Sequence, residues 1–187
     1  MALNLPQTYL IGLCLLLSVI AILVGRQLLK VRRDELKLIK LEKQEANATE
    51  DSAKMYELAS VQLKKRLYPQ ATSTLKQALK KLDGEPEEAK ALIENALGFA
   101  LAAQNDFKSA VIHYKKAISA KSEYRVALNN LGFAYQRLLK EDEAYKNYQE
   151  VLKLDPKNKT AISQIKRLKR IIGKDKDKDK LLKDKGF

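Results

Sequence analysis

The side chains that most often carry out chemistry are scarce in this chain of 187 residues. His113 is its only histidine and Cys14 its only cysteine. The sequence holds no group of Cys and His with metal-ligand spacing, no glycine-rich phosphate loop, and no nucleophile paired with a general base. We therefore expect no enzyme, with no catalytic, metal-binding or cofactor-binding residues and no small-molecule substrate. We interpret His113 as a solvated or packing residue, and Cys14 as a small apolar one without a disulfide partner in the chain.

An internal repeat with a period of 34 residues is the more informative pattern. The segment Asn95–Ala100 returns as Asn129–Ala134, and Ala110 returns as Ala144. This period, with its Leu-Gly pair, a later alanine, a tyrosine and a closing Pro156, resembles the tetratricopeptide repeat (TPR), a pair of antiparallel helices. The resemblance implies an all-α solenoid that binds other proteins and rarely carries chemistry.

Two glycines, Gly98 and Gly132, mark the expected points of closest helix packing, because glycine has no side chain to hold two helices apart. A weaker third unit lies upstream, where Ala71 corresponds to Ala110 and Ala59 replaces the glycine. At the other end, alternating Lys and Asp from Lys174 offer nothing apolar to bury, which is typical of disorder. We predict units at 52–85, 91–124 and 125–158, a cap helix at 159–173, and a disordered charged tail at 174–187.

The N-terminal segment is a candidate membrane anchor. No charged side chain occurs before Arg26, and residues 10–24 are almost entirely aliphatic. About 20 helical residues cross a hydrocarbon core of about 30 Å. We therefore predict a transmembrane anchor at 1–27, with the span at about 6–26. A cleavable signal peptide and a buried core helix are the alternatives, but no Lys or Arg precedes the apolar run, as a signal peptide would require.

The flanks of this segment predict its orientation. Arg26, Lys30, Arg32 and Arg33 follow the apolar run, and nothing basic precedes it. Positively charged flanks stay on the cytoplasmic side, or on the stromal side in a plastid. The repeats are expected on that side, joined to the anchor by a basic helical stalk and a joint at 28–51.

Charge is unevenly spread along the chain. The formal net charge of +13 is concentrated in the stalk, the cap and the tail. Such segments can contact anionic lipid or an acidic partner. Nucleic acid is the generic alternative for a basic protein, but no aromatic residues are interleaved with the lysines of the tail, so we expect no nucleic-acid partner.

The first helix of each TPR unit lines the concave face of a stack, where a partner would bind. Here that stripe is mostly apolar, with two phenylalanines and two asparagines at matching positions of the second and third units. Phe offers area to bury, and an Asn side chain can hydrogen-bond a peptide backbone in both directions. The alternative is that one or both phenylalanines pack within the stack. The predicted partner-binding residues are Tyr56, Leu63, Leu92, Asn95, Phe99, Val126, Asn129, Phe133, Gln136 and Arg137.

One well-known use of this face is not expected. TPR domains that dock chaperones hold the C-terminal carboxylate of a peptide with Lys, Asn and Arg at fixed positions. The corresponding residues here are Tyr56, Ser60, Ala96, Val126 and Asn130. The clamp is missing, so we do not expect the face to recognise a chaperone tail.

The order of segments resembles one family. A single N-terminal span, a basic stalk, three TPR units and a basic cap are similar to the TPR membrane protein encoded by cyanobacteria and algal plastids. The similarity is best over 90–158, and the Lys-Asp tail and Ser122, in place of the proline of the middle unit, depart from it. It carries these segments: Lys90–Ile93, Asn95–Ala100, Val126–Gly132 and Leu152–Pro156.

The resemblance implies a function in photosynthesis. A member of this family would assist the assembly or stability of photosystem I from the thylakoid membrane, with photosystem I subunits or other assembly factors as partners. The residues alone leave a second hypothesis open: a general membrane-bound TPR receptor or adaptor for protein import or another membrane complex.

Overall fold

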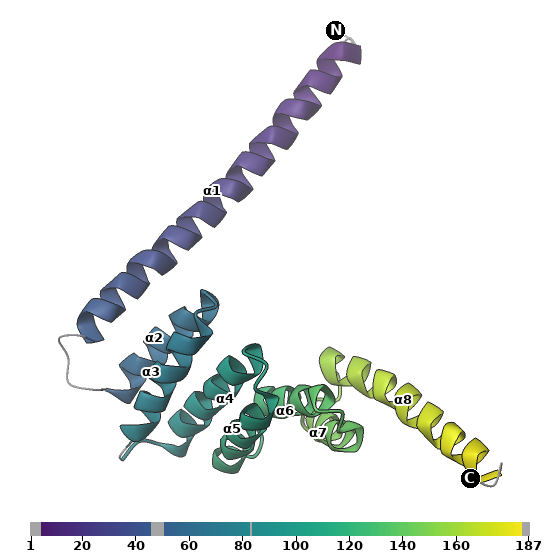
Figure 1. The fold of residues 1–187 in the computed structure, drawn as a ribbon. Helices are drawn as coiled ribbons and strands as arrows, with labels where there is room; N and C mark the ends of the chain where they lie inside the picture. Colours follow the sequence, from purple (N-terminus) through teal and green to yellow (C-terminus); the bar gives the residue numbers. More distant parts are fainter. Residues whose placement is uncertain (1–4, 46–50, 83, 185–187) are drawn as a thin grey trace. The chain divides into compact units, whose positions relative to one another are not determined.

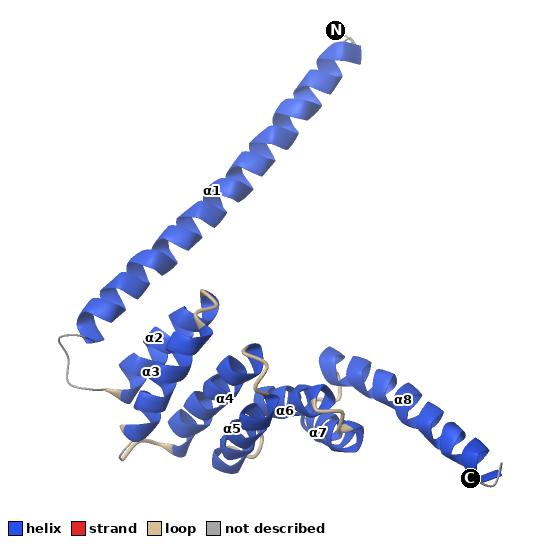
Figure 2. Ribbon diagram, in the orientation of Figure 1, coloured by secondary structure: helices blue, strands red, loops and turns tan. Residues whose placement is uncertain are grey.

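The computed structural model describes residues 5–45, 51–82 and 84–184. These residues form only helices and turns, which confirms the all-α prediction (Figure 2). The chain divides into two units, residues 1–48 and 49–187.

The first unit contains one long helix, α1 (Leu5–Glu45, 41 residues). Pro6 lies in its first turn, where the missing N–H would have no helical partner in any case. The leucine-rich remainder contains no further proline, so nothing interrupts the helix. Among the described residues, α1 is the one helix long and apolar enough to cross a membrane, over Tyr9–Ile39. The expected stalk is helical as far as Glu45, while the joint at 46–50 lies outside the described residues.

The second unit is a stack of antiparallel helices in which each helix packs against the next (Figure 1). In chain order they are α2 (Ser52–Lys64), α3 (Tyr68–Lys80), α4 (Glu87–Ala103), α5 (Phe107–Ala120), α6 (Arg125–Arg137), α7 (Glu141–Leu154) and α8 (Lys159–Asp184). The first three pairs are the first and second helices of the three predicted repeats, and α8 follows the last pair. The TPR solenoid predicted from the period is therefore the fold of this unit.

The second repeat begins earlier than its period suggests. The helix α4 starts at Glu87, one turn ahead of the boundary predicted at 91, with Pro86 as its capping residue. Proline cannot sit inside a helix but suits its start, and the acidic Glu87 and Glu88 in the first turn complement the positive end of the helix dipole. The extra residues between the first two repeats thus lengthen a helix.

Each repeat turns between its helices through one residue with positive φ: Arg66, Asn105 and Leu139 (62°, 64° and 57°). A left-handed residue ends a helix tightly, and asparagine tolerates it better than most side chains. The three residues occupy the same place in their repeats, so the turn geometry repeats even where the residue type does not.

The two repeat glycines make room for tyrosine rings. A Cβ atom at Gly98 would lie 2.7 Å from the ring of Tyr114, and one at Gly132 would lie 2.9 Å from the ring of Tyr148. Both tyrosines are almost completely buried. The close approach predicted at these glycines is therefore that of a side-chain ring on the second helix of the same repeat.

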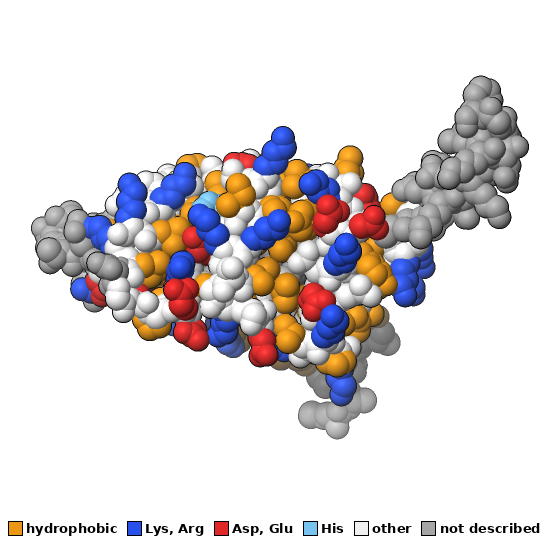
Figure 3. Space-filling view, turned by 90° about the horizontal axis from the view of Figure 1, so that it is seen from below, with side chains coloured by type: hydrophobic (Ala, Val, Ile, Leu, Met, Phe, Trp, Pro, Cys, Tyr) orange, Lys and Arg blue, Asp and Glu red, His pale blue; other side chains and the backbone are white. Residues whose placement is uncertain are grey.

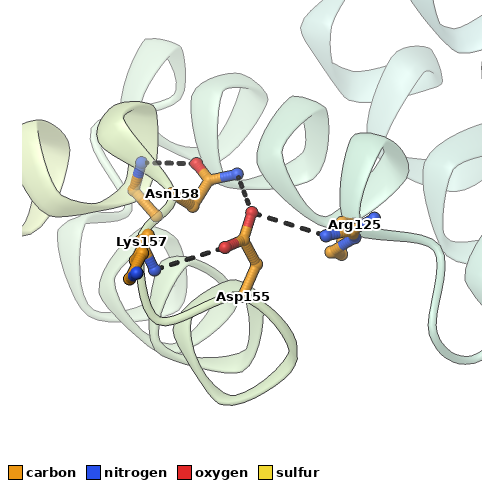
Figure 4. Close-up of polar contacts among 5 residues, drawn as sticks. Arg125, Asp155, Lys157 and Asn158 are labelled. Carbon is orange, nitrogen blue, oxygen red and sulfur yellow. Dashed lines mark hydrogen bonds and ion pairs between the residues drawn. The ribbon is translucent and has the colours of Figure 1, made fainter.

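A group of polar contacts centred on Asp155, the Asp155 cluster, joins α8 to the third repeat (Figure 4). The carboxylate of Asp155 pairs with Arg125 at 3.4 Å and accepts hydrogen bonds from the Asn158 amide and the Lys157 backbone N–H. Asn158 in turn caps α8, because its Oδ1 accepts the N–H of Ala161 at 3.1 Å. The start of α8 is thereby held against the start of α6.

The tail prediction is wrong for most of its length. The helix α8 does not end near 173 but continues to Asp184, so residues 174–184 are helical. Lysine is a good helix former, and the Lys-Asp alternation places opposite charges three residues apart, which favours a helix without any buried apolar surface. Residues 185–187 lie outside the described residues.

Candidate protein-binding face

The first helices of the repeats form one continuous surface. Besides the contacts between consecutive helices, α2 contacts α4 and α4 contacts α6. Neighbouring helices approach most closely on the inner side of a curved stack, so we assign this surface to the inner side. It is called the A-helix face below, and it comprises the outward-facing residues of α2, α4 and α6.

Four large apolar side chains are exposed on the A-helix face. They lie in two pairs seven residues apart, which places each pair on one side of its helix. The pair on α6 repeats the pair on α4 after 34 residues. The exposed fractions are 42% for Leu92, 45% for Phe99, 53% for Val126 and 46% for Phe133. Side chains that are nearly half exposed are available to a partner, whereas the other predicted apolar members, Tyr56 and Leu63, are more buried and pack against the core.

One of the two phenylalanines has a supporting shell. The ring of Phe133 meets the ring of Phe107 edge to face, with 6.3 Å between centroids. The guanidinium of Arg137 lies 4.9 Å from the centroid of the same Phe107 ring, in a cation–π arrangement. Phe133 and Arg137 are thus held in place by Phe107, a residue of α5 that the sequence analysis did not select.

The two predicted asparagines differ in their surroundings. Asn95 donates to the hydroxyl of Tyr124 at 3.3 Å and accepts from the amide of Asn130 at 3.0 Å, so it links the second repeat to the third. Burial and the nearby Tyr56 raise the pKa of Tyr124, which keeps its hydroxyl protonated. By contrast, Oδ1 of Asn129 is buried without a hydrogen-bond partner within the described residues. Asn129, unlike Asn95, therefore has an unused acceptor, but this oxygen lies inside the protein and not on the exposed part of the face.

Gln136 is also engaged within the protein. Its Oε1 accepts from the hydroxyl of Tyr148 at 3.0 Å, and its Nε2 donates to Gln164 of α8 at 3.1 Å. Burial raises the pKa of Tyr148 to about 12, against the opposing effect of the positive charge of Arg167. We interpret Gln136 as a residue that fixes α8, more than as a free contact for a partner.

His113 has a specific partner. Its Nδ1 lies 2.6 Å from Oε2 of Glu94, a carboxylate that is only 4% exposed. The pair joins α4 to α5 inside the second repeat, at a position where the first and third repeats carry the apolar Met55 and Leu128. His113 therefore packs inside the second repeat, against a carboxylate that is itself buried.

Another face of the repeats is chemically mixed. In Figure 3 basic, acidic and hydrophobic side chains are interspersed over the surface that includes the histidine, drawn in pale blue. Within the described residues, no group of His, Cys, Asp and Glu has the arrangement of a metal site. The exposed apolar pairs of α4 and α6 are therefore the strongest candidates for a binding function.

The residues that sequence reasoning missed lie at positions that the repeat pattern leaves variable. Phe107, Tyr124 and Asn130 all contact predicted face residues, yet none is part of the Leu-Gly, Ala, Tyr and Pro pattern. Their aromatic or amide character was the available signal, since Tyr124 precedes α6, Asn130 lies within it and Phe107 begins α5.

Comparison with known proteins supports the repeat assignment. The pattern of the tetratricopeptide repeat family matches residues 95–124 and 126–158. Among solved structures, the chain is similar to MamA, with a TM-score of 0.66 and 18% identity over 73% of this chain and 77% of that one. It is also similar to the first TPR domain of Spaghetti (RPAP3) bound to the HSP90 peptide SRMEEVD, with a TM-score of 0.60 and 21% identity over 67% and 96%. At these identities the likeness shows the fold alone.

Three relatives align along most of the chain. The tetratricopeptide repeat domain-containing protein PYG7, chloroplastic, of Arabidopsis thaliana is 32% identical over 85% of this chain, which spans about half (52%) of that relative's length. The protein ycf37 of Guillardia theta is 30% identical over 88% of this chain and 93% of its own length. The ycf37 protein of Cyanophora paradoxa is 32% identical over 84% and 91%.

The helical stack, the two repeats matched by the family pattern and the near full-length similarity lead to the same assignment. The chain belongs to the ycf37 family and is a tetratricopeptide-repeat scaffold for protein interaction.

Proposed function

We propose that this protein is a membrane-anchored scaffold that promotes the assembly or stability of photosystem I. The observation that carries the proposal is the presence of two matching pairs of exposed apolar side chains on the A-helix face. The pairs are Leu92 with Phe99 and Val126 with Phe133. A soluble protein gains nothing from leaving such side chains in water, so a repeated exposed set marks a surface for a partner. A segment of a photosystem I subunit or of another assembly factor is the proposed occupant.

The anchor is proposed from α1. Apart from Ser18, its side chains from Leu10 to Leu23 are apolar; they are exposed, and none packs into a protein core. A water-exposed helix of this composition is unfavourable, whereas a bilayer solvates it. We place the span in the thylakoid membrane and the repeats on the stromal or cytoplasmic side, on the strength of the basic residues that follow Gly25.

The link to photosystem I rests on kinship. The resemblance found in the sequence implies this role, and a chloroplastic relative is consistent with a plastid location. The fold contributes the kind of activity: a TPR stack brings proteins together without chemistry of its own.

A complementation experiment tests the proposal. A strain lacking the protein is complemented with the wild type, with Phe99→Ala/Phe133→Ala, or with the control Ile112→Ala/Leu139→Ala. The control removes two exposed apolar side chains from outside the A-helix face, which are 55% and 80% exposed. We expect the null strain and the phenylalanine variant to accumulate less photosystem I than the wild type at unchanged photosystem II. The control should restore the wild-type level.

The outcomes separate the hypotheses. Normal photosystem I in the null strain, under stress as well as under standard light, would exclude the assembly role. A defect in the import of membrane proteins in general would favour the receptor or adaptor instead. Full rescue by the phenylalanine variant would keep the assembly role but move the binding surface away from the A-helix face.

A further inference from the structure

The helix α8 continues the register of the repeats. It starts at Lys159, and α6 starts 34 residues earlier, at Arg125. Ala161 is fully buried, as is Ala127 at the matching position of α6, and Leu168 is buried where α6 has Ala134. The predicted cap is therefore placed as the first helix of a fourth repeat.

This register decides which side chains α8 adds to the A-helix face. The positions of Asn129, Phe133, Gln136 and Arg137 on α6 correspond to Ser163, Arg167, Arg170 and Ile171 on α8. The same four residues, together with Lys166, line a surface hollow of about 460 Å³. The repeat arithmetic and the shape of the surface thus identify one site from independent observations.

The hollow is cationic, and nothing nearby in sequence neutralises it. Arg167, Arg170 and Lys166 are all exposed, and no Asp or Glu occurs between Asp155 and Asp175. The A-helix face therefore changes along the stack, from apolar on α4 and α6 to basic on α8.

Several contacts hold α8 in place against the third repeat. The Asp155 cluster holds the start of α8, and the hydrogen bond from Gln136 to Gln164 links α8 to α6. Ile165 and Leu168 pack on the core. A basic surface fixed in this way is preorganised for a ligand, because the backbone loses no freedom when the ligand binds.

We propose that the A-helix face takes an extended partner segment in which an apolar stretch lies next to Asp or Glu residues. The apolar side chains lie on α4 and α6, and the carboxylates lie in the hollow on α8, opposite Arg167 and Arg170. Arginine matches a carboxylate with two parallel N–H donors, which suits this hollow. The inference rests on the proposed function, since it names the chemistry of the segment that the face binds.

The test uses synthetic peptides and the full chain. The protein is placed in nanodiscs of zwitterionic phosphatidylcholine, which offers no competing net negative charge. Three fluorescent peptides share one apolar core of Leu and Phe, followed by four glutamates, four glutamines or four lysines. Binding is measured by fluorescence anisotropy. An exposed ion pair changes an affinity by up to about fivefold, so we expect the glutamate peptide to bind roughly tenfold more tightly than the glutamine peptide. This preference should weaken as salt is added.

Two variants and one control assign the effect. Arg167→Gln/Arg170→Gln should reduce the preference for glutamate to within about twofold, while Arg167→Lys/Arg170→Lys should retain much of it. The control Lys76→Gln/Lys116→Gln removes two exposed charges from second helices and should leave the preference unchanged. Phe99→Ala/Phe133→Ala should weaken all three peptides to a similar extent.

The possible failures are distinguishable. Equal binding of the glutamate and glutamine peptides to the wild type would overturn the inference whether or not any variant folds. A preference that survives in Arg167→Gln/Arg170→Gln would do the same. If the phenylalanine variant binds every peptide as the wild type does, the A-helix face is not the binding surface, and the proposed function loses its main support.

Discussion

At the scale of single residues, two glycines shape the packing of the repeats because they lack a side chain. Gly132 leaves space that the ring of Tyr148 fills, and the hydroxyl of that ring then reaches Gln136. Gly98 and Tyr114 repeat the arrangement one period earlier. The space left by Gly132 thus sets the position of the Tyr148 ring. Through Gln136, which also bonds Gln164, this ring helps to position α8.

The space at Gly132 yields a first prediction. In a soluble fragment 51–187, Gly132→Ala should lower the free energy of unfolding by about 1–3 kcal/mol, because the new Cβ atom forces a buried ring to move. That is a substantial part of the ~5–15 kcal/mol typical of a domain. Urea unfolding followed by circular dichroism measures it. Gly173→Ala is the control: its Cβ atom meets nothing within 4 Å, so helix propensity alone should make it neutral or stabilising. An unchanged midpoint for Gly132→Ala would contradict the packing described.

The left-handed turns yield a second prediction. Leu139 has φ 57° and is 80% exposed, so it bears the cost of this conformation without burying its side chain. Leu139→Asn should raise the free energy of unfolding by about 1 kcal/mol. The reciprocal change Asn105→Leu, at the same place in the preceding repeat, should lower it by a similar amount. Two changes of the same sign would show that the turn conformation is not their cause.

Sequence reasoning located the A-helix face but not the state of each residue on it. Phe99 and Phe133 could be assigned because a 34-residue period transfers a face from one repeat to the next. The engagement of Asn95 could not, because its partners Tyr124 and Asn130 come from the following repeat boundary and helix. Periodicity shows which way a side chain points, whereas a hydrogen-bond partner depends on the angle between neighbouring helices.

At the scale of helices, the ends are decided by individual polar groups. The carboxylate of Asp106 accepts the backbone N–H of Ser109 and so caps α5. Hydrogen bonds from the side chain and backbone of Ser109 hold the pKa of Asp106 below its usual value of 3.8. The stabilisation by this cap is therefore present above the unfolded-state pKa and is lost as the pH falls through the lower folded-state pKa.

This cap gives a third prediction. Asp106→Ala should lower the free energy of unfolding by about 1 kcal/mol at pH 7. The difference from the wild type should shrink as the pH falls below about 4, because the protonated carboxyl no longer accepts well. Urea unfolding at a series of pH values measures both effects, with the exposed Glu123→Ala as the control. A difference that stays constant down to pH 2 would show that Asp106 acts through packing, not through its charge.

Helix boundaries were the less predictable part of the fold. The start of α4 at Glu87 and the continuation of α8 to Asp184 both depart from the expected limits. In both places the TPR pattern ends, so a prediction of the helix limit can use only the helix propensity of the residues and the sequence of their charges. Buried apolar positions predict where a helix packs, but they say little about how far it extends past its last contact.

At the scale of the whole molecule, two units with different surfaces follow one another in the chain. The apolar side chains of α1 are exposed, whereas the repeats bury their own core. A fourth prediction follows from the proposed anchor. The protein should stay in the membrane pellet after washing with alkaline carbonate, because a spanning helix is held by burial and not by charge.

The same membranes test the orientation. Protease added from the stromal or cytoplasmic side should digest the repeats and leave a small fragment that contains α1. An unrelated lumenal protein serves as the control for sealed vesicles. Release by carbonate would refute the anchor, and protection of the repeats in vesicles of that orientation would reverse its direction.

The contacts of the repeat stack also bear on how the protein is made. Helices α2 to α8 contact partners one or two places away along the chain, so each can dock on a helix that has already left the ribosome. The apolar part of the A-helix face is then complete while α8 is still being synthesised. A nascent chain would therefore expose the apolar surface of α4 and α6 before the basic residues of α8 are in place. A partner that needs both parts would bind only once α8 has docked.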